Sequence, residues 1–255
     1  ISFNGTSLIN GSSENSFNHI TINAAKSLTA PIGNMYVAGN FTNNGTFNHN
    51  NGMITFDGAQ AMALSGTTTF FDLIVAKIGN SSVTFSGNTN LQNNFYVTSG
   101  NAVLSSFDFS VNGNTTVSGG LDFNNTVGIK TFNNITLNTG STWSNSGNED
   151  ITINGNFLSN GTFTSGSGTY TFSGTIPQTI GGTSSITYNN LTINNSSLTG
   201  VDINTPVDLN GTLTLTDGIL KTTPENILTM NNGSSSTFGS AGSFVFGPMQ
   251  KTGTS

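Results

Sequence analysis

The sequence predicts an all-β chain folded as a parallel β-solenoid (β-helix), and two observations carry this prediction. One short string occurs four times, at Phe17, Phe70, Phe132 and Tyr188. In it an aromatic residue and two turn-forming residues precede an alternating apolar–polar–apolar strand. Candidate core positions also recur at steps of roughly 16 to 21 residues, such as those from Phe17 to Val37 and from Val37 to Ile54, which suit one coil of a solenoid. The alternative, a tandem array of β-sandwiches, would repeat at about 100 residues.

Alternation along each strand assigns its apolar residues to the interior, because successive side chains point to opposite faces. In the copy that begins at Phe132, Ile135 and Leu137 therefore face inward and Thr136 faces outward. We expect the leading strands of the four copies to occupy equivalent inward sites. Three coils would then form a super-unit of about 53 to 62 residues. The expected core residues are Ile20, Ile22, Leu73, Val75, Ile135, Leu137, Ile153, Phe157, Tyr170, Phe172, Leu191 and Ile193.

The expected organisation has three parts. Residues 1–16 form an N-terminal strand and loop, and residues 17–230 form the solenoid repeats, with units starting near 17, 70, 132 and 188. Residues 231–255 form the last coil and a segment that leads out of it, in which Pro248 ends any central strand. At the corners, Asn-Gly pairs such as Asn44-Gly45 are expected to supply a positive φ. Stacked Asn side chains are expected to form hydrogen-bonded ladders.

Composition excludes several classes of protein. Only 6% of the residues are charged, against a usual share of about 25%. The net charge is −6 and the five cations are all Lys, so no basic stripe is present to bind nucleic acid. The absence of Cys excludes disulfides and thiolate metal sites. No apolar run approaches the roughly 20 residues of a membrane span. Because the chain begins at Ile1 without Met, we expect a mature or proteolysed piece of a longer protein.

Three strings resemble the repeats of large surface proteins of Bacteroidetes: residues 168–174, 178–180 and 188–194. The closing string, residues 247–253, resembles the segment that often ends such repeat blocks. The resemblance implies adhesin-like cargo of the type IX secretion system, located outside the cell or on its surface. We therefore expect a non-enzymatic, secreted structural repeat protein that serves as the stalk or fibre of an adhesin or extracellular filament. The expected partners are further repeats or subunits of the same protein, together with surface or extracellular glycans.

A polysaccharide-active β-helix enzyme is a third hypothesis, and it would need clustered carboxylates. The only adjacent pair, Glu149-Asp150, lies in a Ser/Asn/Gly turn and is interpreted as a solvated corner, so no catalytic residue is expected. Asp202 and Asp208 flank a turn and are weak calcium candidates; no other cofactor is expected. His19 and His49 occupy corner positions and are not expected to bind metal.

Two features of the sequence raise the possibility of a ligand-binding function. Trp143 is either a platform for a sugar ring or a bulky core residue, and the core is the favoured interpretation. The sugar platform would belong to the second hypothesis for the function, a carbohydrate-binding module. A row of outward residues in the four copies (Thr21, Ile74, Thr136, Thr192) raises ice binding as a further alternative. Alternating Thr is, however, also what an exposed β-face prefers.

Overall fold

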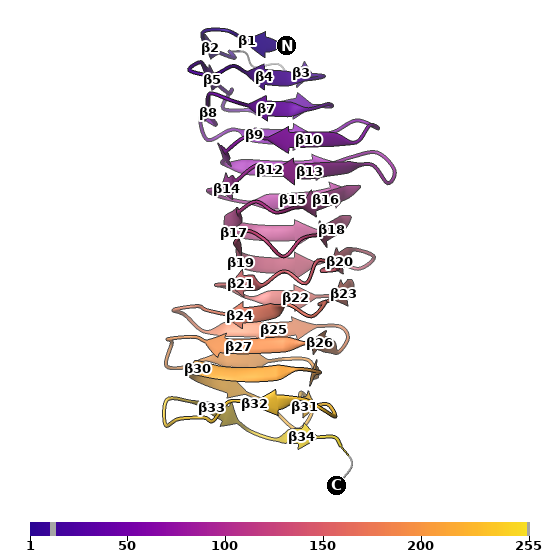
Figure 1. Cartoon of the computed structure of the whole chain (residues 1–255), viewed down its shortest axis with the longest axis vertical. Helices are drawn as coiled ribbons and strands as arrows, with labels where there is room; N and C mark the ends of the chain where they lie inside the picture. The colour runs from indigo at the N-terminus through magenta and orange to yellow at the C-terminus, as the bar shows by residue number, and fades with distance from the viewer. Residues whose placement is uncertain (11–13, 254–255) are drawn as a thin grey trace. The chain divides into compact units, whose positions relative to one another are not determined.

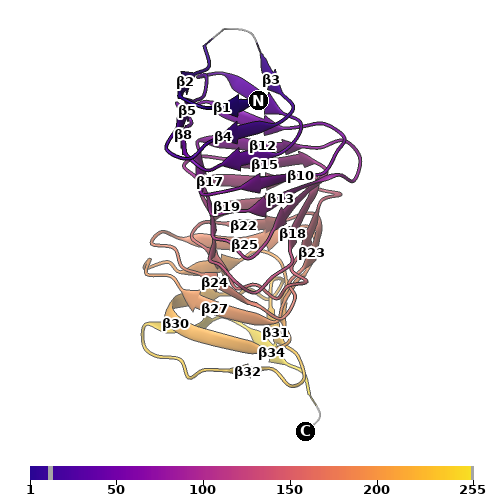
Figure 2. The same cartoon turned by 45° about the horizontal axis from the view of Figure 1, so that its top comes forward.

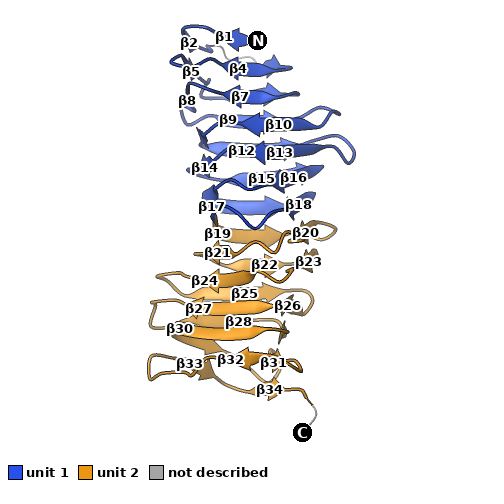
Figure 3. Ribbon diagram, viewed as in Figure 1, with its two compact units in different colours: residues 1–129 blue, residues 130–255 orange. Residues whose placement is uncertain are grey.

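The computed structural model describes residues 1–10 and 14–253. Every regular element among them is a β-strand, and none of these residues forms a helix that could span a bilayer. The chain divides into two compact units, residues 1–129 and 130–255 (Figure 3). Within each unit, strands pair in parallel with strands about one coil away in the sequence, and the chain makes about 12 turns. The predicted β-solenoid is thus confirmed, and the tandem β-sandwich alternative is wrong.

In unit 1 each coil contributes strands to three faces, and successive coils stack in layers (Figure 1). Face 1 comprises β1 (Ser2–Phe3), β4 (Ile20–Ile22), β7 (Phe41–Asn43), β10 (Met62–Ser65), β13 (Ser82–Ser86), β16 (Asn101–Leu104) and β18 (Gly120–Phe123). Face 2 comprises β2 (Thr6–Leu8), β5 (Ser27–Thr29), β8 (Thr46–Asn48), β11 (Thr68–Phe70), β14 (Thr89–Leu91) and the first part of β17 (Phe109–Val117). Face 3 comprises β3 (Asn15–Phe17), β6 (Asn34–Val37), β9 (Met53–Phe56), β12 (Asp72–Ala76), β15 (Phe95–Ser99) and the rest of β17. Figure 2 shows neighbouring strands such as β10 and β13 side by side.

Unit 2 repeats the three-faced plan with its own strands. Its face 1 comprises β20 (Thr142–Ser144), β23 (Thr162–Thr164), β26 (Ile186–Tyr188), β29 (Val207–Leu209), β31 (Leu228–Met230) and β34 (Met249–Lys251). Its face 2 comprises the first part of β19 (Lys130–Leu137), β21 (Ile151–Ile153), β24 (Thr169–Phe172), β27 (Asn190–Asn194), the first part of β30 (Thr212–Lys221) and β32 (Ser235–Ser236). Its face 3 comprises the rest of β19, β22 (Phe157–Ser159), β25 (Gln178–Gly182), β28 (Val201–Ile203), the rest of β30 and β33 (Ser243–Phe246).

The coils are longer than the sequence suggested, and they vary in length. The register pairs Ser2 with Thr21 near the start of the chain and Gly218 with Ser243 near its end, where the coil is longer. One expected step, from Val37 to Ile54, was misaligned, because Val37 pairs with Phe56. A shift of two residues keeps each side chain on the correct side of the strand, so alternation alone does not reveal it. The step expected from the sequence therefore underestimates the number of residues in a coil.

All twelve expected core residues are at most 1% exposed, but the four leading strands are not equivalent. In unit 1, Ile20 lies on face 1 and Leu73 on face 3. In unit 2, Ile135 lies on face 3 and Leu191 on face 2. The recurring string marks a corner followed by a strand, and corners of similar construction occur between different faces. The expected super-unit of three coils is therefore not a repeat of the three-dimensional structure.

The solenoid also begins earlier than expected. Residues 1–16 were predicted to be a strand and loop outside the repeats, and residues 11–13 of that loop lie outside the described residues. The strands β1, β2 and β3 nevertheless form a coil that pairs with the next one: Phe3 pairs with Ile22, and Leu8 with Thr29. At the other end, β33 and β34 extend the stack as the expected last coil.

Side chains at the corners tie each coil to the next. The Asn134 side-chain oxygen accepts a hydrogen bond from the main-chain N–H of Asn156 (2.8 Å). The Asn156 side chain in turn accepts one from the N–H of Thr179 (2.8 Å). Direct contact between two Asn side chains also occurs, from Asn231 to Asn210 (2.7 Å). The expected Asn ladders are thus present, but much of their bonding is side chain to main chain.

Glycine serves these corners mainly through its size. Gly45, expected to supply a positive φ, does not have one. A Cβ at this position would lie 2.3 Å from the carbonyl oxygen of Lys26, in the preceding coil. Gly45 is therefore required because the backbones of two coils approach closely, and the expectation of a positive φ is wrong at this corner.

Candidate functional site

Trp143 lies in the core of unit 2 and does not form a ligand platform. Its side chain is 0% exposed, and its indole N–H donates a hydrogen bond to the Tyr170 hydroxyl (3.0 Å). The Tyr170 hydroxyl also accepts a bond from the Asn145 amide (3.3 Å) and donates one to the carbonyl of Ser165 (3.3 Å). The core interpretation of Trp143 is correct, and the suggested ligand contact is wrong because no ligand can reach the ring.

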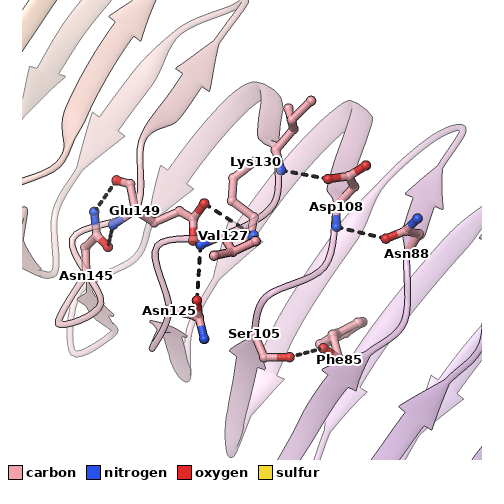
Figure 4. A network of polar contacts seen from close by, with 10 residues as sticks. Phe85, Asn88, Ser105, Asp108, Asn125, Val127, Lys130, Asn145 and Glu149 are labelled. Carbon is pink, nitrogen blue, oxygen red and sulfur yellow. Dashed lines mark hydrogen bonds and ion pairs between the residues drawn. The ribbon is translucent and has the colours of Figure 1, made fainter.

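Glu149 is not the solvated corner residue that the sequence indicated. It is 1% exposed, and its carboxylate lies 3.5 Å from the ammonium group of Lys130 (Figure 4). The Asn145 side chain fixes the turn by accepting a bond from the N–H of Glu149 and donating one to its carbonyl, both 2.8 Å. Burial raises the pKa of Glu149, and the charge of Lys130 opposes that effect. A group enclosed in this way cannot contact an external substrate.

The remaining carboxylate candidates are separate from one another. Asp150 is exposed, and it accepts a bond from the N–H of Thr169 (2.7 Å). Asp202, on face 3, lies 3.7 Å from Lys221, whereas Asp208, on face 1, stands between Thr187 and Thr229 in register. The structure therefore does not bring the two calcium candidates onto one face. No group of three or more metal-ligating side chains occurs within residues 1–10 and 14–253.

The histidines are engaged in the corners that the sequence assigned to them. The His19 ring accepts a hydrogen bond from the N–H of Asn40 (2.9 Å). The His49 ring accepts one from the N–H of Asn51 (3.0 Å) and stacks on Phe71, with ring centres 5.8 Å apart.

The outward Thr row expected from the four copies does not exist, because Thr21, Ile74 and Thr192 lie on strands of different faces. The register reveals another row that the sequence analysis missed, on face 2 of unit 2. It comprises Thr131, Thr152, Thr171, Thr192 and Thr214, each partly exposed. Only the correct coil length brings these residues into line.

The surface of unit 1 has a shallow groove of about 100 Å³ along the start of β11, β14 and β17. Hydroxyl, amide and carboxylate side chains from three successive coils line it: Thr67, Thr69, Asn88, Asn90, Asp108 and Ser110, with Thr68 and Thr89 beneath. Larger open hollows occur near Ile32 in unit 1 (about 170 Å³) and near Ile176 in unit 2 (about 370 Å³). The first groove differs from these in containing a carboxylate.

Hydrogen bonds between coils hold the side chains of this groove in place. Asn88 accepts a bond through its side-chain oxygen from the N–H of Asp108 (3.1 Å), and Asp108 accepts one from the N–H of Ile129 (2.8 Å) (Figure 4). The Ser110 hydroxyl donates to the Asn90 side-chain oxygen (2.8 Å). The Asn88 amide NH₂ and the second Asp108 oxygen make no hydrogen bond within the part of the chain that the structure describes. The groove therefore presents a fixed donor and a fixed acceptor.

The sequence analysis missed this groove. Its signal is the recurrence of polar residues directly before a buried strand residue, as in Thr67, Asn88 and Asp108. The chain matches no protein-family model, no curated protein and no solved structure with which we compared it.

Proposed function

We propose that the chain is a non-enzymatic, secreted structural protein, the stalk or fibre of a cell-surface adhesin or extracellular filament. The observation that carries this proposal is the parallel stacking of coils in each unit, in which main-chain pairing joins successive coils and corner side chains such as Asn134 and Asn156 add further bonds. Such repeats bury a continuous core and extend by addition of coils. The resemblance to Bacteroidetes surface repeats supports export by the type IX system and an extracellular location.

The low charge of the chain suits this role. Only 6% of residues are charged, so the flanks carry mostly amide and hydroxyl groups and attract few ionic partners. Burial of Glu149 against Lys130 argues against the polysaccharide-active enzyme, because it removes one member of the only adjacent carboxylate pair from reach of a substrate.

The proposed location is tested by labelling. An antibody against the chain should label intact, unpermeabilised cells of the organism that encodes it, and deletion of a type IX secretion component should abolish the labelling. Labelling that appears only after permeabilisation would overturn the proposal of a surface stalk.

Further strands of the same protein, or another subunit, are the proposed partners. Met249 continues the inward row of Val207 and Leu228, which are fully buried, yet Met249 is 45% exposed. An apolar side chain at the open edge of a sheet favours pairing with further strands. We expect the purified chain to associate as its concentration rises over a hundredfold range in analytical ultracentrifugation, and Met249→Lys to reduce this association. A chain that stays monomeric throughout would contradict the proposed partner.

A further inference from the structure

We propose that the shallow groove along β11, β14 and β17 of unit 1 binds a neutral saccharide through the hydroxyl groups along one edge of a sugar ring. This inference gives the groove a ligand class, and it does not depend on the proposed role as a stalk. The residues that carry it are Asn88 and Asp108, with the hydroxyl groups of Thr67, Thr69 and Ser110 beside them.

Preorganisation is the first argument. The side-chain oxygen of Asn88 and one carboxylate oxygen of Asp108 each accept a hydrogen bond from a main-chain N–H of the next coil, which fixes both side chains. The remaining groups, an amide NH₂ and a carboxylate oxygen, therefore need little ordering when a ligand binds. Groups that are already immobilised cost a ligand less entropy on association.

The complementarity is the second argument. A sugar hydroxyl both donates and accepts, so adjacent hydroxyls on a ring can accept from the Asn88 amide and donate to the Asp108 carboxylate. The Thr67 and Thr69 hydroxyls can take either role. The side-chain hydroxyls and amides of the groove come from three successive coils, so the hydrogen-bonding groups are arranged along the stack.

Size and charge narrow the ligand class. A volume of about 100 Å³ corresponds to about three water molecules at ~30 Å³ each, well below the range of enclosed small-molecule pockets. The groove therefore accepts the edge of a ring and leaves the rest of the ligand outside. Unit 1 contains five side-chain carboxylates but only two lysines. One of the two lysines, Lys77, is fully buried. This balance disfavours acidic polysaccharides and favours neutral ones.

Two nearly isosteric substitutions test the groove. Asp108→Asn keeps the oxygen that accepts from Ile129 but replaces the outward acceptor with a donor. Asn88→Asp keeps the oxygen that accepts from Asp108 but replaces the outward donor with an acceptor and a charge. The matched control is Asp72→Asn, since Asp72 accepts a similar bond from the N–H of Asn94 (2.9 Å) outside the groove.

The experiment screens the full chain against soluble β-1,4-glucan, β-1,3-glucan, xylan and mannan oligosaccharides, with polygalacturonate as the acidic comparison. Bound oligosaccharides are then titrated by calorimetry, with and without EDTA, and the thermal unfolding of each variant is recorded. We expect at least one neutral oligosaccharide to bind, Asp108→Asn and Asn88→Asp each to weaken it tenfold or more, and Asp72→Asn to change it less than twofold. EDTA should have no effect.

Several results would overturn the inference. These are binding of none of the neutral probes, preference for polygalacturonate, equal weakening by Asp72→Asn, or loss of binding in EDTA, which would identify a cation site instead. If Asn88→Asp unfolds the chain, Asp108→Asn and Thr69→Val still decide the question. Failure of surface labelling with saccharide binding intact would reject the stalk and leave this inference standing.

Discussion

The ammonium group of Lys130 and the carboxylate of Glu149 lie 3.5 Å apart inside unit 2, with side chains that are 0% and 2% exposed. Burial of an isolated charge in a protein interior is strongly unfavourable, and a paired charge avoids most of that penalty. The two residues belong to successive coils, so the contact depends on the stacking of one coil on the next.

Removal of one member of this pair should destabilise the fold. We expect Glu149→Ala to lower the free energy of unfolding by about 3 to 5 kcal/mol, because Lys130 would remain buried without the carboxylate. Urea unfolding measures the effect. The neighbour Asp150 provides the control, since Asp150→Asn keeps the oxygen that accepts from Thr169 and should change stability by less than about 0.5 kcal/mol. Equal stability of Glu149→Ala and the parent would show that the pair is not needed.

The two buried tyrosines of unit 2 should respond differently to loss of their hydroxyl groups. Tyr170→Phe removes the acceptor of the Trp143 indole N–H and one of the two bonds of the Asn145 amide in the core, and we expect a cost of about 1 to 3 kcal/mol. The Tyr188 hydroxyl is buried and has no hydrogen-bond partner among the described residues. Tyr188→Phe should therefore leave the melting temperature unchanged or raise it. Similar losses in both variants would contradict the hydrogen-bond assignment.

Lys77 should make the stability of the chain depend on pH in the alkaline range. Its side chain is fully buried, and its ammonium group donates to the carbonyls of Ala38 (3.0 Å) and Asp57, each in an earlier coil. Burial lowers the pKa of Lys77 from its ordinary value of 10.5, and the nearby Asp57 charge opposes this effect. Because the lysine pKa is lower in the folded state, the unfolded chain binds the proton more tightly. The contribution of this pKa difference to the free energy of unfolding is fully present above pH 10.5. It is lost as the pH falls through the pKa of Lys77 in the folded state.

The difference between parent and Lys77→Met isolates this contribution. The free energy of unfolding of the parent should increase relative to that of the variant as the pH rises toward 10.5. Lys26→Met, at an exposed lysine, should follow the parent. Parallel profiles for Lys77→Met and the parent would show that Lys77 titrates as it does in the unfolded chain.

Gly45 should be intolerant of a side chain. A Cβ there would lie 2.3 Å from the Lys26 carbonyl, so Gly45→Ala must push two coils apart, at a cost of about 1 to 3 kcal/mol. Gly5 is the control, because a Cβ at Gly5 meets nothing within 4 Å and its φ is not positive. Chemical unfolding should show Gly5→Ala close to the parent, and an equally mild Gly45→Ala would contradict the close approach.

The sequence predicted the architecture because the solenoid depends on local alternation and on one repeated step. The expected step from Phe17 to Val37 corresponds to a pairing in the structure. The next step was misjudged, since Ile54 and Phe56 both face inward and alternation does not distinguish them as the partner of Val37. Alternation also fails to identify the partner of Thr192, which is Thr171 in the register of the structure. The sequence analysis therefore placed Thr192 in the wrong outward row.

The sites were less accessible to sequence reasoning because they combine residues from different coils. Glu149 follows Ser, Asn and Gly, a context typical of a solvated turn, and its burial depends on Lys130 in the coil before. The groove likewise requires Asn88 and Asp108 to be neighbours, which follows only from the pairing of Thr89 with Phe109.

The variable length of the coils has an evolutionary consequence. Ser2 and its partner Thr21 are closer in the sequence than Gly218 and its partner Ser243, yet the inward rows continue in both cases, since the corners absorb the difference. A gene duplication or deletion that covers one complete coil would therefore preserve every remaining pairing and change the stack by one layer of about 4.8 Å. Selection can therefore adjust the number of coils one at a time, while point mutations separately change the side chains that each coil presents on its surface.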